Sequence, residues 1–124
     1  MEPVVSAFKV EFHRGTLSRE EMGEALSRYL TSVARALQDA GCPLIGHIKL
    51  MLSGEGVGYL MANHTSFFES PSVTGSLESE IDRGTLTVHA VVYGTGKRLL
   101  EDILKSSLKK SIPSLSLRPG HPQE

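Results

Sequence analysis

The chain has 124 residues, of which 40% are hydrophobic, 22% charged and 6% aromatic. This length is typical of one domain with its own core, so we expect a single domain over residues 4–112 and a flexible C-terminal tail over 113–124. The 13 lysines and arginines nearly balance the 14 acids, leaving a formal net charge of -1. The whole chain therefore has no electrostatic reason to bind nucleic acid or an anionic membrane.

Two further features bear on location and redox chemistry. No apolar run approaches the roughly 18–20 residues of a membrane span, and the N-terminus lacks the apolar stretch of a signal peptide, so we expect a cytoplasmic protein. The single cysteine, Cys42, excludes an intrachain disulfide framework and a multi-cysteine metal site within one chain.

A strand and a helix are the first elements expected along the chain. Apolar and charged residues alternate over 4–13, which is the period of a strand with one buried face. Ser18 and Glu21 have the spacing of a capping box, so a helix should begin there. Apolar residues then recur at three- and four-residue spacing as far as Leu37, and Gly41 can take the left-handed conformation that ends a helix.

A hairpin is expected next. Residues 44–52 alternate again, and the turn-forming sequence at 53–56 predicts a hairpin into a strand over 57–67. The stretch 69–84 is rich in Ser, Gly, Pro and acids, so we expect a long loop there, with a short strand near 73–77.

The last two expected elements are a strand and a helix. Residues 86–93 show the strongest alternation in the chain and predict a strand that ends at Gly94. Thr95 is suited to cap the following helix, whose expected apolar stripe consists of Leu99, Leu100, Ile103, Leu104 and Leu108.

The resulting order, β-α-β-β-β-α, predicts an α/β (α+β) fold: a two-layer sandwich of the ferredoxin-like kind, with both helices on one face of the sheet. The closing strand of a ferredoxin-like unit is not visible in the sequence. A second chain could cover the edge left open, or one sheet could lie against another, so we expect a homo-oligomer.

One segment has the composition of an anion-binding turn. Glycines, a hydroxyl and a cation occur together where the second helix should begin, at Gly94, Thr95, Gly96 and Lys97. The segment lacks the full spacing of a phosphate loop. We predict a small-molecule anion there; the alternative is an ordinary strand-to-helix turn. No Gly-x-Ser-x-Gly motif is present, and Cys42 lies near a helix end, so nucleophilic catalysis has little support.

Three histidines form the candidate metal site. By strand parity His13, His47 and His89 all point away from the helices, and imidazoles from neighbouring strands can share a divalent transition metal such as zinc, copper or nickel. The alternative is that they are solvated or belong to a subunit interface. His64 has the opposite parity and is expected near the helical layer.

Short segments of the strand core resemble a known family. They are Gly-His-Ile-Lys at 46–49, Gly-Tyr-Leu at 58–60 and the strand 86–94, and the similarity covers residues 44–94. They are similar to the small C-terminal domain that follows the GTPase domain in CobW-like proteins, which act in cobalamin synthesis and as metallochaperones. The resemblance implies an accessory α/β domain linked to metal or cobalamin handling. The nucleotide loop and the Cys-x-Cys-Cys motif of the family are absent here, so neither GTP hydrolysis nor a metal ligand is carried over.

The leading hypothesis is an accessory or binding domain that uses its open sheet face for self-association and for a metal or small ligand. A small oligomeric enzyme is the second, with His47 or His89 as general acid or base and Lys49 holding an anionic substrate. A third is a purely structural interaction module in which the stretch 69–84 contacts another protein.

Overall fold

The computed structural model describes residues 2–111 and 116–119. Its elements in chain order are β1 (Pro3–Leu17), α1 (Arg19–Asp39), β2 (Leu44–Gly54), β3 (Gly58–His64), β4 (Ser72–Leu77), β5 (Ile81–Tyr93), α2 (Lys97–Ser111) and β6 (Ser116–Pro119).

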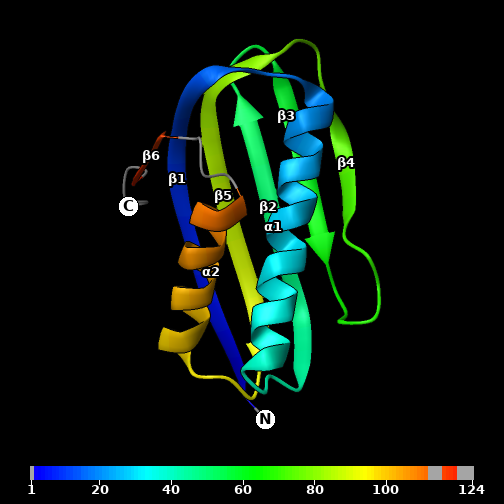
Figure 1. The fold of residues 1–124 in the computed structure, drawn as a ribbon, viewed down its shortest axis with the longest axis vertical. Coiled ribbons are helices and arrows are strands. Elements are labelled where there is room, and N and C mark those ends of the chain that lie inside the picture. The colour runs from blue at the N-terminus through cyan, green and yellow to red at the C-terminus, as the bar shows by residue number, and fades with distance from the viewer. Residues whose placement is uncertain (1, 112–115, 120–124) are drawn as a thin grey trace.

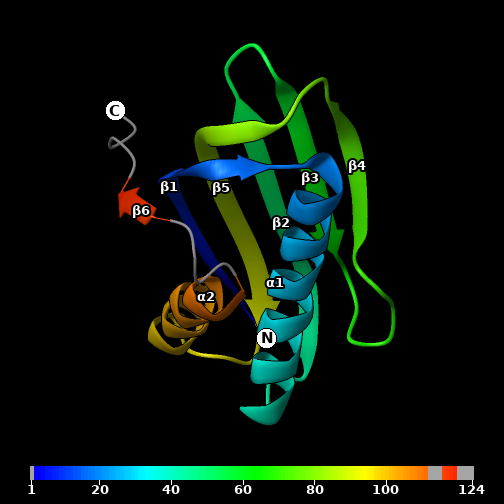
Figure 2. The same ribbon diagram turned by 45° about the horizontal axis from the view of Figure 1, so that its top comes forward.

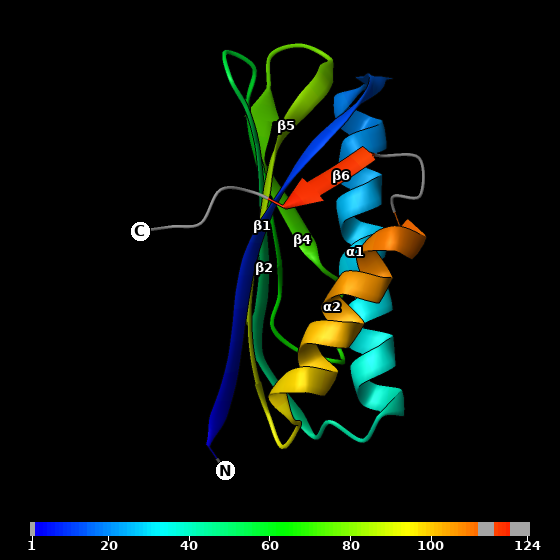
Figure 3. The same cartoon turned by 90° about the vertical axis from the view of Figure 1, so that its left-hand side faces the viewer.

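The strands form one sheet in the order β4-β3-β2-β5-β1-β6, and every neighbouring pair is antiparallel (Figure 1). Strand β5 lies between β1 and β2, which are therefore parallel to each other without being neighbours. Both helices lie on the same side of the sheet, and the described chain leaves the other side uncovered (Figure 3). Seen obliquely, α1 crosses in front of β2 and β3, while α2 lies toward the β1 edge (Figure 2). No described helix has the length and apolar character needed to cross a bilayer.

The predicted mixture of strands with two helices is confirmed, whereas the predicted order of elements lacked two strands. The short strand expected near 73–77 is present as β4, and β5 begins at Ile81, earlier than the alternation over 86–93 indicated. Strand β4 and the first residues of β5 lie in the stretch 69–84, whose Ser, Gly and acidic residues favour a loop. Pairing with neighbouring strands overrides that local preference.

The C-terminal stretch also differs from expectation. Residues 113–124 are predicted to form a flexible tail, yet Ser116–Pro119 form β6, antiparallel to Val10–His13 of β1. The prolines and polar residues of this stretch favour a tail, but main-chain groups supply the pairing, and a short edge strand tolerates a proline at its end. The remaining residues of the tail lie outside the described part of the chain.

Both ends of α1 follow from local chemistry. The Glu21 amide donates to Ser18 Oγ at 3.1 Å, and the Ser18 amide donates to Glu21 Oε1 at 3.1 Å, which confirms the capping box. At the other end Gly41 has φ 89°, and the Cys42 amide donates to the Leu37 carbonyl at 2.9 Å. This is a Schellman ending, in which a glycine with positive φ lets the chain turn back and satisfy the last carbonyls.

The start and the apolar stripe of α2 differ from the prediction by small amounts. The Gly96 carbonyl accepts the first helical hydrogen bond, from the Leu100 amide at 3.1 Å, so Gly96 rather than Thr95 is the cap. Leu99 was expected in the stripe but is 42% exposed, while Ser107 is buried.

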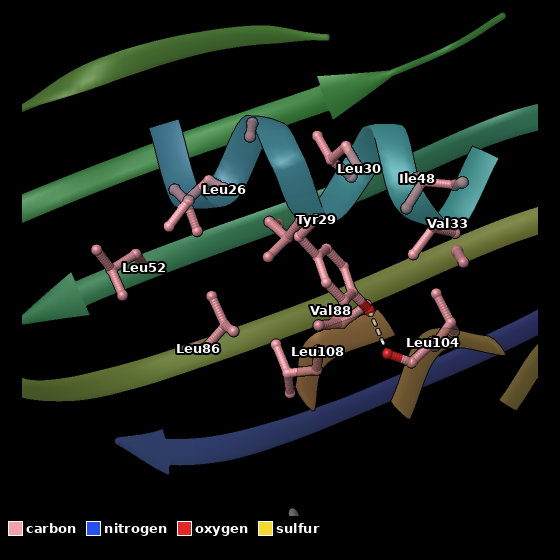
Figure 4. Packing of buried hydrophobic residues seen from close by; sticks show 14 of the residues in the cluster. Leu26, Tyr29, Leu30, Val33, Ile48, Leu52, Leu86, Val88, Leu104 and Leu108 are labelled. Atoms are coloured by element: carbon pink, nitrogen blue, oxygen red, sulfur yellow. Dashed lines mark hydrogen bonds between the residues drawn. The ribbon is translucent and has the colours of Figure 1, made fainter. Parts of the chain in front are cut away.

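The core lies between the helices and the sheet. Its centre is β5, where the side chains of Leu86, Val88, Ala90 and Val92 are each no more than 1% exposed. Tyr29 of α1 is fully buried among them, and its hydroxyl donates to the Leu104 carbonyl of α2 at 2.8 Å (Figure 4). Burial raises the pKa of Tyr29 far above its ordinary value, so this hydroxyl keeps its proton. The bond links the two helices over the same sheet face.

We predict that Tyr29→Phe lowers the free energy of unfolding by about 1 kcal/mol, because it removes one buried hydrogen bond while keeping the ring. Urea unfolding of both proteins measures the difference. Tyr59→Phe is the matched control: Tyr59 is 50% exposed, so the same change there should stay within about 0.5 kcal/mol of wild type. Equal effects at the two positions would contradict the assigned role of Tyr29.

Candidate functional site

The sheet surface opposite the helices, here called the open face, holds the candidate site. Strand pairing places on it alternate residues of the neighbouring strands. Several of its apolar side chains are well exposed, namely Val5, Leu44, Met51 and Tyr59. Polar and cationic residues lie among them, including the histidine pair formed by His47 and His89.

A bulge in β2 decides which residues of that strand reach the open face. The register with β5 shifts between Ile45 and His47, so Gly46 is an extra residue in the ladder. Ile45 and Ile48 are consequently both buried although they are three residues apart, and Leu44 and His47 lie on the open face. A Cβ at Gly46 would lie 3.0 Å from the Val91 carbonyl oxygen, so the bulge suits a glycine.

His47 and His89 meet directly. His47 Nε2 lies 3.0 Å from His89 Nδ1, and the two ring planes are 15° apart with centroids separated by 5.1 Å. The ring centroids are much farther apart than the two nitrogens, so the two rings point these nitrogens toward each other. One ring donates and the other accepts, so at least one imidazole presents an unprotonated nitrogen to its neighbour. The pair lies across adjacent strands, since Lys49 faces His89 and Val91 faces His47 in the register.

The surroundings of His47 disfavour positive charge on its ring. Partial burial lowers the pKa of His47, and the neighbouring His89 and Lys49 lower it further. His47 is therefore neutral near pH 7, which is the form that binds metals and accepts protons.

The third predicted metal ligand is not brought to the pair. His13 pairs in register with Arg83, whereas His89 pairs with Ala7, six positions away along β1. At about 3.3 Å per residue the two positions are about 20 Å apart along the strand. Strand parity predicts which face of the sheet a side chain lies on, but not its position along the strand. His13 therefore lies far from the pair along β1 although parity predicts the same face. Among the described residues, no group of three or more potential ligands could hold a metal ion.

The predicted anion site is a strand-to-helix turn. Gly94 follows β5 with φ 75°, and Gly96 and Lys97 are exposed at the start of α2. Anion binding at Gly94, Thr95, Gly96 and Lys97 stays a prediction.

His64 lies on the helical side of the sheet, as strand parity predicts. Its side chain is 5% exposed on the helical side of β3, opposite the histidine pair. Neither of its ring nitrogens has a hydrogen-bond partner within the described residues. Parity indicated the side of the sheet, whereas the surroundings of the ring depend on α1 and on the loop between β3 and β4, which line the pocket beside it.

The chain matches no protein-family model, and neither a curated protein nor a solved structure matches it. The chemistry of the site is therefore argued from its own residues.

We predict that NMR titration gives His47 a pKa below its ordinary 6.5, and that Lys49→Met raises it by removing a nearby cation. Lys9→Met, which removes a cation from β1, is the matched control and should change the His47 pKa less. Because the unfolded chain binds this proton more readily, His47 costs stability as the pH falls below about 6.5. His47→Gln should make unfolding less sensitive to acid; an unchanged pH profile would contradict the assignment.

We predict that Gly46→Ala lowers the free energy of unfolding by about 1–3 kcal/mol, because the added methyl meets the Val91 carbonyl. It should also shift the NMR resonances of the histidine pair. Gly23→Ala in α1 is the control: its Cβ would meet nothing within 4 Å, so it should stabilise the protein by about 0.5–1 kcal/mol. A Gly46→Ala protein as stable as wild type would show that the bulge does not need glycine.

Proposed function

We propose that this protein is a small cytoplasmic metal-binding domain that associates with a second copy of itself through the open face. The observation that carries the proposal is the separation of 3.0 Å between His47 Nε2 and His89 Nδ1 on an uncovered sheet surface. The proposal agrees with the metal handling that the resemblance to CobW-like proteins implies.

The spacing of the two nitrogens suits a transition metal. Imidazole nitrogens bind zinc at about 2.0–2.1 Å, so two ligands of one ion lie about 3–3.4 Å apart. In the structure the two nitrogens face each other across a hydrogen bond, so metal binding requires one ring to rotate and the shared proton to leave. Metal and proton therefore compete for the pair, and affinity should fall at acid pH.

Two imidazoles leave a zinc, copper or nickel ion short of ligands, since these ions commonly take four or more. A second copy of the chain would supply another histidine pair. Val5 and Leu44 are the exposed apolar residues nearest the pair in the strand register, and Met51 and Tyr59 continue the apolar surface farther along β2 and β3. Self-association would bury this surface. Metal binding and self-association then become one event, with the ion bound between two open faces.

We also infer that the fold is a ferredoxin-like two-layer sandwich with an inserted hairpin. The order β6-β1-β5-β2, with a helix after β1 and another after β5, supports this plan. Strands β3 and β4 are then an insertion that extends the sheet beyond β2, and β6 takes the place of the closing strand.

A small oligomeric enzyme is the second candidate, favoured by the hydrogen bond within the histidine pair. A neutral His47 can accept a proton and His89 can share it, which is the behaviour required of a general base.

Metal binding tests the proposal. We expect Zn²⁺, Ni²⁺ or Co²⁺ to raise the Tm of the wild-type protein, and sedimentation to show a dimer with metal and a monomer with EDTA. His47→Ala and His89→Ala should fold with little loss of stability but lose both responses. His13→Ala is the matched control, because its position is too far along β1, and should respond like wild type.

Absence of any thermal shift in the wild-type protein, or an undiminished shift in both histidine variants, would refute metal binding by the pair. A dimer that persists in EDTA and in His47→Ala would show that self-association is independent of the metal. Unfolding of His47→Ala would make this residue structural instead.

A further inference from the structure

A second location, on the helical side of the sheet, holds a polar group without a partner. The His64 imidazole is 95% buried, since its exposed fraction is 5%, and both ring nitrogens lack hydrogen-bond partners within the described residues. Buried polar groups are nearly always paired, because leaving one unpaired forfeits its hydration without compensation. His64 thus offers a buried donor and a buried acceptor that no group of the described residues satisfies.

His64 forms part of the wall of a pocket of about 240 Å³. The last turns of α1 contribute Thr31, Arg35 and Gln38, and the loop between β3 and β4 contributes Phe67, Glu69, Ser70 and Pro71. This volume is below the roughly 300–1,000 Å³ of sites for drug-sized ligands, so the pocket suits a smaller molecule.

The pocket wall carries one cation and one anion. Arg35 and Glu69 are exposed at the rim, and neither forms an ion pair within the described part of the chain. A guanidinium recognises a carboxylate and a carboxylate recognises an ammonium group. The two rim charges cancel overall, so a ligand with a single charge would be attracted by one residue and repelled by the other.

We propose that this pocket binds a small zwitterion of the α-amino acid class, with Arg35 on its carboxylate, Glu69 on its ammonium group and His64 as a third hydrogen-bonding group. This site shares no residue with the histidine pair, so the proposed amino-acid site and the proposed metal site can be tested independently. Because the ring nitrogens of His64 are shielded from solvent, the wall formed by α1 and the loop of residues 65–71 must open for the ligand to reach them.

NMR titration with L-alanine tests this site. We expect L-alanine to shift the His64 ring resonances and the amides of residues 65–71 in a saturable way below about 10 mM. Propionate lacks the ammonium group and ethylamine lacks the carboxylate, so each should bind at least about tenfold more weakly.

Variants of the rim and the wall separate binding from folding. Arg35→Gln and Glu69→Gln should each weaken L-alanine binding by about tenfold or more, whereas Arg28→Gln, on the same helix but outside this pocket, should leave it unchanged. His64→Phe removes the unpaired nitrogens and should raise or maintain the Tm while reducing binding.

Three results would overturn the proposal. They are the absence of any saturable shift with L-alanine, equal affinity for propionate or ethylamine, and undiminished binding in Arg35→Gln or Glu69→Gln.

Discussion

The structure depends on the one-sided burial of β5. This strand pairs with β1 on one side and β2 on the other, and its alternate residues from Leu86 to Val92 are removed from water beneath both helices. Burial of apolar surface is the main stabilising contribution to folding. The apolar side of β5 therefore determines which face of the sheet the two helices cover and which face stays open. The Tyr29 hydrogen bond to Leu104 then joins the two helices over this face.

The same constraint exposes the other face of the sheet. An antiparallel sheet with one solvated face is common, but here that face carries well-exposed apolar side chains together with the histidine pair. A one-residue slip in β2 would move every side chain of that strand to the opposite face. The bulge at Gly46 allows Ile45 and Ile48 to be buried together and leaves His47 on the opposite face. Gly46 therefore positions His47 through the backbone, although it has no side chain of its own.

The two faces offer different chemistry. On the open face the imidazoles of His47 and His89 lie at the surface, where a large ligand or a second chain could approach, and the environment of His47 disfavours its protonation. On the helical face His64 is buried beside a pocket of about 240 Å³ lined by α1 and the loop between β3 and β4. Histidine thus occupies two environments in one sheet because successive residues of a strand face opposite ways.

The sequence by itself determined the local elements: the Ser18 capping box, the Gly41 helix ending and the alternation that separates Val88 from His89 are all set by neighbours a few residues apart. It also assigned His47 and His64 to opposite faces. Tertiary structure alone decided the pairing of β4 and β6, the contact between His47 and His89, and the separation of His13 from them. Strand order and register bring together residues distant in sequence, and the periodicity of a single strand carries no information about which strand lies beside it or how far along it a residue will lie.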